Sequence, residues 1–523
     1  MIVDVVLDYD CQLEKYLKSR YHKMQNFKIL KKSLDARGAN RGIKPKFTYK
    51  IDVIFDSQKI ESSVIIDEKN CSTTKIFDKK NDRPIIVGAG PSGLFCALKL
   101  LELGVKSILL ERGERVNIRV KKIARYWKTG ELDINSNVCF GEGGAGLFSD
   151  GKLMTRIKSP YVDYVLGKLV EFGAPEDIIY SSSPHIGSNK LRKVIIKIVD
   201  YLKANGVCVQ FNAVVSDILT NDGEVKGVLL ADGQEIYASR VVLASGHSAR
   251  DVYQLLQRKN IAIEAKDFAV GVRIEHPREF IDELQLGSFK NDSLIGAARY
   301  RLAYTNNKTQ RGVYSFCMCP GGFILSAGNE IDGMLVNGMS NYLHNSKWSN
   351  SAIVVTIDAK KDLFQANNQL AGIYFQREIE KRAFELSKKH SNGIKLPAQS
   401  VHSFLNDLSK SKKTICNNLP ESSTISGVFN CKMDELFQDF ICKHLREAII
   451  QFDKKMKGFI SDKAIIVGPE TRTSSPVRVI REKTTLQSIN CKNLYPCGEG
   501  AGYAGGITSA AVDGVRVACV IAE

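Results

Sequence analysis

The stretch Pro84-Ile-Ile-Val-Gly88-Ala-Gly90-Pro-Ser-Gly93 decides the fold of this chain. A short apolar run leads into a GxGxxG turn, and the apolar segment Leu94 to Leu103 that follows predicts a helix. A second strand is expected at Ser107 to Leu110, and it ends in Glu111. The motif alone is weak, but a glycine turn between strand and helix, followed by an acidic strand end, is typical of a dinucleotide-binding unit.

Each glycine of this turn has its own physical role. Gly88 permits the tight turn, Gly90 lets the backbone approach a pyrophosphate, and Gly93 lets helix and strand pack closely. The first helical turn attracts phosphate through its free N–H groups and the helix dipole. Glu111, 23 residues after Gly88, is placed to bind ribose hydroxyls, which favours FAD or NAD over NADP. The alternative interpretation is a glycine-rich turn without a ligand.

Later segments favour FAD. The region before Val215 is expected to present backbone to adenine, and a strand after Arg240 ends in a small Ala-Ser-Gly turn beside the adenosine half. The glycine-rich segment Phe140 to Lys152 suits a nest of N–H groups along the pyrophosphate and flavin. The cofactor contacts predicted up to this point are Gly88, Gly90, Pro91, Ser92, Gly93, Glu111, Arg112, Arg119, Gly144, Ala145, Gly146, Val215, Ala244 and Gly246.

The segment Leu494 to Gly514 closes the predicted cofactor site. A short strand ends in Gly498-Glu499, and a helix is expected to begin near Ile507 after Gly505 and Gly506. The N–H groups and positive dipole end of that helix would stabilise charge at the pyrimidine edge of an isoalloxazine ring. Glu499 is expected to bind a ribityl hydroxyl, while the two glycines keep side chains away from the ring. An ordinary glycine-rich turn before a helix is the alternative.

Composition places the chain among soluble globular proteins. It has 523 residues, which suggests about three domains, and 44% of them are hydrophobic. No apolar run is long enough to span a membrane, and Asp4, Asp8 and Asp10 occupy the place of a secretory signal, so a cytoplasmic location is expected. The 13 cysteines are scattered singly, which favours reduced thiols. No metal site is predicted.

The net charge of +17 raises the question of a nucleic-acid partner. Basic residues recur throughout the chain, as in Lys121-Lys122 and Lys388-Lys389, without aromatic interleaving or a nucleic-acid fold signature. A nucleic-acid partner is therefore disfavoured but left open, and acidic small substrates fit the charge equally well.

Element patterns predict an α/β fold with a Rossmann-type FAD-binding domain, an inserted α+β substrate or cap domain and a small N-terminal domain. The leading unit has the order β-α-β-β, compatible with a ferredoxin-like arrangement, and the polar stretch 78–83 is the expected linker. Strands are expected within 260–345, and helices at Ile373 to Lys388 and Asp434 to Met456. The predicted boundaries are 1–80 for the leading domain, 81–260 for the first part of the FAD domain, 261–460 for the cap and 461–523 for the closing part.

With these motifs assembled, the chain resembles a family of bacterial FAD-dependent dehydrogenases, largely uncharacterised, whose FAD-binding fold is of the glutathione reductase and hydroxybenzoate hydroxylase type. The resemblance implies an accessory N-terminal domain, an interrupted FAD domain and an oxidoreductase activity. Flavoproteins often carry Gly-Asp where this chain has Gly498-Glu499, so the ribityl contact must accommodate one more methylene. The motifs that carry it are the segments 32–37, 88–93, 139–146, 149–153, 246–251, 317–322 and 470–478 and the closing glycine motif.

Four side chains are candidates for catalysis. Lys152 follows the glycine-rich segment and suits an acidic substrate or the flavin, with a solvated cation as the alternative. Arg273 and His276 share a predicted strand and could flank a substrate, although a structural role is common for a single histidine. Arg472 lies in a loop rich in guanidinium and hydroxyl groups that suits anion recognition, with an interdomain salt bridge as the alternative.

The Cys317-Met-Cys319 stretch has three open interpretations. Structural packing is the simplest, because a disulfide across one residue is strained and the usual dithiol spacings are absent. A redox role and a metal-binding role remain as alternatives.

The sequence therefore predicts an FAD-dependent oxidoreductase that transfers hydride between flavin N5 and a small, anionic or neutral substrate. Only one GxGxxG unit occurs in a β-α-β setting, so any NAD(P)H is expected to visit transiently. A flavin-dependent RNA-modifying enzyme and a non-catalytic FAD-binding protein are the alternatives. The oligomeric state is left open.

Overall fold

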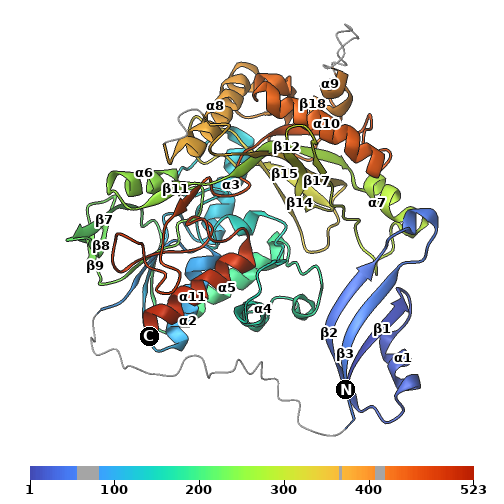
Figure 1. The fold of residues 1–523 in the computed structure, drawn as a ribbon, viewed down its shortest axis with the longest axis horizontal. Helices are drawn as coiled ribbons and strands as arrows, with labels where there is room; N and C mark the ends of the chain where they lie inside the picture. The colour runs from blue at the N-terminus through green and yellow to red at the C-terminus, as the bar shows by residue number, and fades with distance from the viewer. Residues whose placement is uncertain (56–81, 364–367, 407–417) are drawn as a thin grey trace.

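The computed structural model describes residues 1–55, 82–363, 368–406 and 418–523 (Figure 1). A parallel sheet of five strands carries the glycine motifs, in the order β22 (Leu494–Pro496), β10 (Val241–Leu243), β4 (Ile85–Val87), β5 (Ile108–Leu110) and β6 (Cys208–Gln210). β4, β10 and β22 are buried along their whole length, as expected for parallel strands covered on both faces. The expected α/β class is confirmed.

Two helices that are far apart in the sequence, one after the first strand of this sheet and one after its last, pack against each other. α2 (Pro91–Glu102) packs against α11 (Ile507–Ala522) so closely that a Cβ on Gly514 would lie 2.0 Å from the Ser92 carbonyl oxygen. α5 (Ser188–Ala204) contacts α2 and leads into β6. Figure 1 shows α11 and α2 crossing near the C-terminus. β22, near the end of the described residues, therefore completes a sheet that includes β4 from the first hundred residues, and α11 packs against the helix that follows β4.

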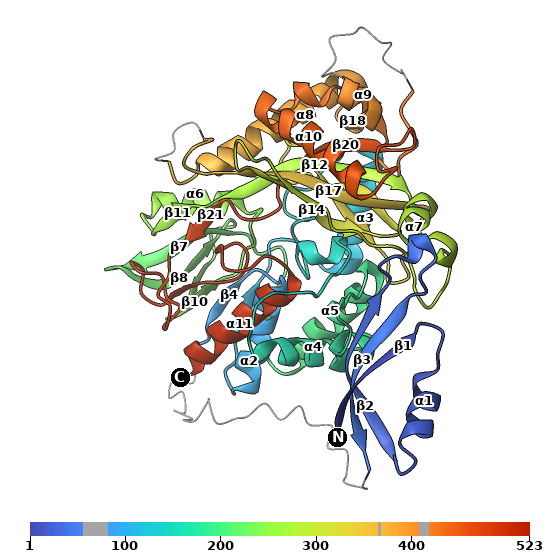
Figure 2. The ribbon, with the colours of Figure 1, turned by 45° about the vertical axis from the view of Figure 1, so that its right-hand side comes forward.

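A second, mostly antiparallel sheet lies above the parallel one in Figure 2, where β12, β14 and β17 appear above β4 and β10. Its strands are β13 (Ala303–Thr305), β14 (Gly312–Cys319), β17 (Trp348–Ile357), β12 (Phe268–Pro277), β20 (Ile465–Glu470), β18 (Leu396–Ser400) and β19 (Val428–Asn430) in spatial order. One face of β12 packs its apolar residues against α8 (Ala371–Ser391) and α10 (Asp439–Lys455). The hairpin of β15 (Gly322–Ser326) and β16 (Val336–Ser340) contacts β12, β14 and β17.

The region expected to be helical after residue 363 contains strands as well. α8 covers the first predicted helix, whereas α10 begins at Asp439, after the predicted start at Asp434. β18 and β19 lie between these two helices and extend the antiparallel sheet. Strands of five and three residues are too short for a periodic pattern to reveal them. β18 pairs with β20, which comes later in the chain, so its strand conformation depends on a distant partner.

The remaining described elements connect these sheets. The helices are α3 (Val116–Thr129), α4 (Tyr161–Glu171), α6 (Arg250–Arg258), α7 (Arg278–Leu286) and α9 (Val401–Asn406). The strands are β7 (Val215–Asn221), β8 (Glu224–Leu230), β9 (Glu235–Tyr237), β11 (Ile263–Ala265) and β21 (Val477–Val479). Five short 3-10 segments complete the set, η1 (Ala39–Arg41), η3 (Ala145–Phe148), η4 (Glu176–Ile179), η5 (Gly287–Phe289) and η6 (Met433–Glu435).

The first 55 residues form a three-stranded antiparallel sheet beside the rest of the molecule (Figure 2). β1 (Ile2–Asp8), α1 (Leu13–Arg20), β2 (Asn26–Asp35) and β3 (Lys46–Ile54) follow one another, and β3 lies between β1 and β2. This is the split β-α-β order that ferredoxin-like units share. Residues 78–81 of the expected linker at 78–83 lie outside the described residues.

Within the part of the chain that the structure describes, we find no helix with the length and apolar character needed to cross a membrane.

Candidate cofactor and active site

The predicted glycine segments converge at the carboxyl ends of the parallel strands. A Cβ on Gly88, whose φ is +106°, would lie 2.5 Å from the Ala244 carbonyl oxygen. A Cβ on Gly144 would lie 3.1 Å from the Gly90 Cα. These close approaches need residues without side chains. The turn after β4, the end of β10 and the 141–146 loop are therefore brought into one place.

The closing segment meets the same place. A Cβ on Gly146 would lie 3.2 Å from Ile507 Cγ1, and one on Gly498 would lie 2.5 Å from Ser92 Oγ. The Gly498 amide donates a 2.8 Å hydrogen bond to Asp513 of α11, and Asp513 is held in turn by Arg481. The start of α11 thus lies beside the loop that covers the start of α2.

Glycines at the starts of α2 and α11, and Gly246 after β10, border open space. A Cβ on Gly505, Gly506 or Gly246 would meet no atom within 4 Å, and one on Gly90 would meet only the Gly144 Cα, at 3.9 Å. A helix start leaves its first N–H groups without intrahelical partners. We refer to the open space that these glycines border as the crevice. Two helix starts beside it suit an extended dinucleotide, with the pyrophosphate at α2 and the ring system at α11. The residues present therefore fit the predicted cofactor.

Glu111 holds the loops around this crevice. Its buried carboxylate accepts hydrogen bonds from the Ala89, Gly113 and Gly141 amides, at 2.8, 2.9 and 2.9 Å. These three amides belong to three different segments, so the carboxylate fixes their relative positions. Its contact with a ribose hydroxyl stays a prediction.

The two arginines predicted near the adenosine half have their own protein partners. Arg119 is fully buried and donates to the carbonyl oxygens of Asn137, Val138 and Glu142 at 2.8 to 2.9 Å. The Arg119 guanidinium therefore fixes the backbone that leads into the glycine-rich loop. The Arg112 guanidinium pairs with Asp251 and lies 4.5 Å from the ring centroid of Phe140.

Glu499 combines burial with nearby charge. Burial raises the pKa of its carboxyl group to about 7, and the Lys266 ammonium opposes this shift. His247 Nε2 lies 3.8 Å from its carboxylate, and burial lowers the pKa of that histidine to about 4. Glu499 is therefore a carboxyl group that can hold or release a proton near neutral pH.

Lys152 connects the start of α11 to the antiparallel sheet. The Thr508 hydroxyl in the first turn of α11 donates a 2.8 Å hydrogen bond to the Leu153 carbonyl oxygen. The Lys152 amine donates to the Met318 carbonyl oxygen of β14 and lies 3.5 Å from Asp150 Oδ2. Its side chain is 30% exposed. The predicted catalytic lysine therefore lies between the predicted ring end of the crevice and the Cys317-Met-Cys319 stretch.

Sequence reasoning missed a buried pair behind Lys152. Asp150 accepts hydrogen bonds from Ser340 Oγ and from His344 Nε2, the latter at 3.0 Å. Although burial acts against it, the Lys152 charge and the His344 hydrogen bond lower the pKa of Asp150. His344 stacks on His185 with ring centroids 4.1 Å apart. Asp150 lies within the 149–153 motif, but no local sequence pattern connects it to a histidine 194 residues later.

Arg273 and His276 do not come together. Arg273 is fully buried and binds Glu470 through two hydrogen bonds of 2.8 and 3.0 Å, and Asn350 through a third of 2.8 Å. His276 lies on the other face of β12, where Nε2 is 2.8 Å from the Phe459 carbonyl oxygen. Side chains three positions apart in a strand point to opposite faces. Of Arg273 and His276, only Arg273 lies beside the Cys317-Met-Cys319 stretch.

Arg472 belongs to a buried ionic network. Its Nε and Nη2 donate to Glu380 of α8 at 3.0 and 2.7 Å, and Arg250 of α6 donates to the same carboxylate at 2.8 and 2.9 Å. Despite its burial, these two arginines lower the pKa of Glu380 to about 2. The Arg472 guanidinium thus links the 470–478 loop to α8, and an additional contact with substrate stays a prediction.

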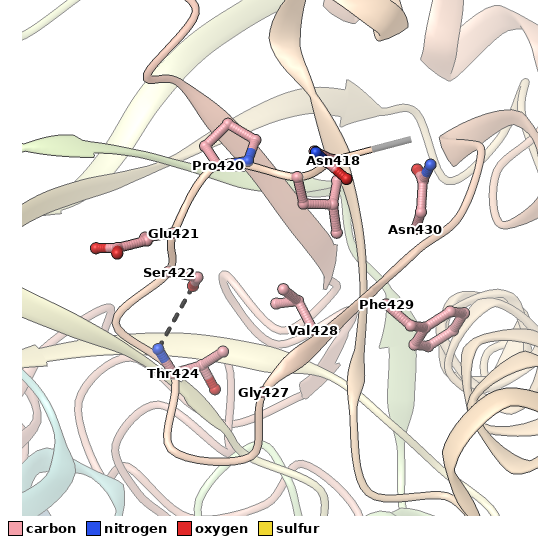
Figure 3. Close-up of a pocket in the computed structure, with 10 residues that line it drawn as sticks. Asn418, Pro420, Glu421, Ser422, Thr424, Gly427, Val428, Phe429 and Asn430 are labelled. Carbon is pink, nitrogen blue, oxygen red and sulfur yellow. Dashed lines mark hydrogen bonds between the residues drawn. The ribbon is translucent and has the colours of Figure 1, made fainter. Parts of the chain in front are cut away.

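A separate pocket is lined by residues of the segment 418–430, which carries β19 (Figure 3). Its lining contains none of the predicted site residues. In the described ranges, no group of three or more His, Cys, Asp and Glu side chains could hold a metal ion. The pocket is lined by Asn418, Leu419, Pro420, Glu421, Ser422, Thr424, Gly427, Val428, Phe429 and Asn430.

Comparisons with known proteins place these features in a family. Residues 267–473 match the FAD-dependent protein, C-terminal domain-like family. An uncharacterized protein of Clostridium beijerinckii is 42% identical over 504 residues, which cover 95% of this chain and 92% of that protein. Among solved structures, a flavin-dependent brominase is 12% identical with a TM-score of 0.37 and covers 84% of this chain and 80% of its own. An open flavocytochrome c3 fumarate reductase is 12% identical with a TM-score of 0.34 and covers 84% and 77%.

At these scores the solved structures contribute nothing to the assignment, which depends on the family match and the relative. The match covers most of the antiparallel sheet and α8 and α10, and the relative extends across the glycine crevice as well. The fit of the crevice to an extended dinucleotide agrees with the family match. The chain therefore belongs to this family of FAD-dependent proteins, and FAD is its cofactor, as its sequence predicts.

Proposed function

We propose that the protein is an oxidoreductase in which a hydride passes between N5 of the flavin and a small, anionic organic substrate. FAD supplies the two-electron chemistry when it is bound. The observation that supports this proposal is the chain of contacts from α11 through Leu153 to Lys152, in which the lysine directly precedes the residue that is hydrogen-bonded to the start of α11. A cation there suits a carboxylate-bearing substrate.

The protein's own groups have separate roles in this proposal. The N–H groups at the start of α11 stabilise negative charge that develops at the pyrimidine edge. Lys152 orients the substrate, and Asp150 with His344 fixes the position of Lys152. Glu499, with a pKa of about 7, holds or releases a proton next to the ribityl side. The antiparallel sheet covers the front and excludes water.

Anaerobic stopped-flow spectroscopy tests the proposal. The purified yellow holoenzyme is mixed with NADH, NADPH and a panel of small hydroxy, amino and unsaturated acids, and the oxidised flavin absorbance is followed. We expect rapid bleaching with at least one anionic compound, and a higher KM for it in Lys152→Met than in the wild type. A flavin that stays oxidised with every compound would favour the non-catalytic alternative and overturn the proposal.

The exposed basic residues of β2, β3 and the turn between them keep an RNA-modifying function as a second candidate. Lys28, Lys31, Arg41, Lys46 and Lys50 are exposed there. Phosphate contacts by such residues would make RNA retention fall steeply with salt. If the holoenzyme binds a mixed tRNA fraction at low salt with a slope that Lys28→Glu plus Lys31→Glu reduces, this second candidate is supported. Retention without such a slope would contradict it.

A further inference from the structure

The Cys317-Met-Cys319 stretch ends β14 in an irregular conformation. The pairing of β14 with β17 shifts register between Phe316 and Cys319, and Cys317 has a φ of +44°. Residues with a side chain rarely adopt this left-handed conformation, and it recurs at bulges near functional sites. Cys317 is partly exposed, whereas Cys319 is fully buried. Residue 317 thus reaches the surface in part, and Cys319 is enclosed.

The Cys319 thiol donates a 3.3 Å hydrogen bond to the Cys317 carbonyl oxygen, so the two cysteines are in direct contact. A hydrogen bond from Cys319 lowers the pKa of Cys317 despite burial, and the charges of Lys152 and Arg273 lower it further. The same hydrogen bond, together with burial, raises the pKa of Cys319. These opposite shifts favour the thiolate at Cys317 over the thiolate at Cys319. This is the division of roles found in thiol pairs that exchange electrons.

Charged groups reach this pair from several elements. Arg273 of β12 places Nη1 3.3 Å from the Cys317 carbonyl oxygen and 3.9 Å from Cys319 Sγ. Lys152 donates to the intervening Met318 carbonyl oxygen. The negative groups are Asp150 beside Lys152, Glu470 on Arg273, and Glu499, whose pKa the Cys317 charge raises. The two cations outweigh these carboxylates in their effect on Cys317.

The surroundings of Cys319 are closely packed on one side and incompletely hydrogen-bonded on another. A Cβ on Gly322 would lie 2.5 Å from the Met339 carbonyl oxygen and 2.9 Å from the Cys319 Cβ, so β15 approaches the end of β14 closely. Asn350, the strand partner of Cys319, is fully buried, and its Nδ2 has no hydrogen-bond partner among the described residues. A buried donor without a partner is uncommon and points to a group that is absent here.

We propose that Cys317 and Cys319 form a redox-active thiol pair that exchanges one electron pair with the flavin in the crevice, with Cys317 as the attacking thiolate. This rests on the bound flavin of the proposed function, but not on hydride transfer from a substrate. The link to the crevice is the Lys152–Leu153 segment, which contacts β14 at one residue and α11 at the next.

The exchange balances without another reactant. One S–S bond forms between Cys317 Sγ and Cys319 Sγ, and the S–H bond of Cys319 breaks. The electron pair passes to the oxidised flavin, and the proton released by Cys319 accompanies it. In the reverse direction the disulfide is reduced and the flavin is oxidised. A disulfide across a single residue is strained, so it is easily reduced, which suits an exchanging pair better than a structural one.

Other buried cysteines of the chain lack this setting. Burial raises the pKa of Cys96 in α2 and of Cys442 in α10, as expected for thiols that only fill the core. Metal binding is disfavoured because no group of metal ligands surrounds the pair in the described residues.

Differential alkylation of the holoenzyme tests the proposal. Trypsin releases residues 312–347, a peptide that contains Cys317, Cys319 and no other cysteine. The holoenzyme is reduced anaerobically with dithiothreitol, desalted, exposed to air, and quenched at intervals with N-ethylmaleimide in denaturant. We expect the doubly alkylated peptide to disappear and its disulfide form, two hydrogens lighter than the unmodified dithiol peptide, to appear.

The flavin dependence of this oxidation is the decisive comparison. In Gly90→Glu, whose carboxylate occupies the phosphate side of α2, oxidation of the pair should slow by about tenfold or more. Cys11→Ser, a change at an exposed thiol, should behave as the wild type does. A peptide that remains doubly alkylated in air, or an oxidation rate that is equal with and without flavin, would overturn the proposal. Disulfide formation without any substrate-driven bleaching would overturn only the hydride transfer.

The pH dependence of iodoacetamide labelling provides a second measurement. In the reduced holoenzyme, Cys317 should react about tenfold faster near pH 6 than a thiol of ordinary pKa in the same peptide when unfolded. Cys319→Ser and Lys152→Met should each move the labelling profile to higher pH, because each removes a group that stabilises the thiolate. A profile identical to that of the unfolded peptide would contradict the assigned thiolate.

Discussion

At the scale of single residues, Glu499 shows how burial determines a charge. Burial raises the pKa of its carboxyl group to about 7, above the unfolded value of about 4.3. For an acid whose folded pKa is raised, the folded state binds more protons, so stability is lost as the pH rises between these two values. The FAD-free protein should therefore be less stable at pH 8 than at pH 5 because of this residue.

Replacing Glu499 with Gln removes that dependence. We expect Glu499→Gln to stabilise the FAD-free protein by on the order of 2 kcal/mol near pH 8, and by much less near pH 5. Urea unfolding at both pH values measures the difference. Exposed Glu482→Gln is the matched control and should change stability little at either pH. An equal effect of Glu499→Gln at both pH values would show that its carboxyl group is not shifted.

Gly90 offers the sharpest test of where the pyrophosphate binds. Its φ of −78° is open to any residue, and a Cβ there would meet only the Gly144 Cα at 3.9 Å. Gly90→Glu should therefore fold but place a carboxylate where phosphate would bind, and yield colourless protein. Gly167→Glu in α4, where a Cβ also meets open space, should stay yellow. Normal flavin content in Gly90→Glu would refute the placement of the pyrophosphate at α2.

At the scale of elements, the contact between α2 and α11 depends on a single glycine. A Cβ on Gly514 would lie 2.0 Å from the Ser92 carbonyl oxygen, so Gly514→Ala must separate the helices. We expect a loss of about 1–3 kcal/mol in stability and weaker flavin retention. Thermal unfolding and flavin release measure both. Gly167→Ala in α4 should be neutral or stabilising by up to about 1 kcal/mol, because alanine favours helix. Equal stability of both variants would contradict the close contact.

The network around Glu380 joins α6, α8 and the 470–478 loop. Its pKa of about 2 lies below the unfolded value, so its contribution to stability is present above about pH 4 and is lost as the pH falls towards 2. Glu380→Gln leaves Glu330, 3.2 Å from Arg250 and 3.9 Å from Arg472, as the remaining counter-charge of two buried arginines, and should cost up to about 3 kcal/mol near neutral pH. Acid titration of unfolding should show this difference shrinking below about pH 4. Exposed Glu385→Gln on the same helix should show no such loss.

The sequence predicted short local motifs better than clusters of side chains that come from distant segments. The turn from Gly88 to Gly93 and the start of α11 follow from short patterns of glycine and apolar residues. The period of two along β12 also contains the information that Arg273 and His276 face opposite ways. By contrast, the meeting of Lys152, Arg273 and Cys317 depends on three distant segments, and no local pattern encodes it.

At the scale of the whole molecule, the N-terminal sheet is attached through the edge of β2. The Lys32 amide donates to the Tyr180 carbonyl oxygen at 2.7 Å, and the Ser182 amide donates to the Lys32 carbonyl oxygen at 2.8 Å. Hydrogen exchange should therefore show protection at the Ser182 amide. Lys32→Pro removes the first donor and should release that protection, whereas Lys31→Ala should retain it. Rapid exchange at Ser182 in the wild type would show that the sheet does not dock there.

The position of β22 and α11 in the chain has a consequence during synthesis. The parallel sheet needs β22 beside β10, and the predicted ring end of the crevice is the start of α11, so residues 494–522 complete both. While the ribosome still conceals these residues, the growing polypeptide cannot acquire its flavin. Until residues 494–522 emerge, the edge of the incomplete sheet and the uncovered side of α2 must be kept apart from other nascent chains, so this interval carries the greatest risk of aggregation.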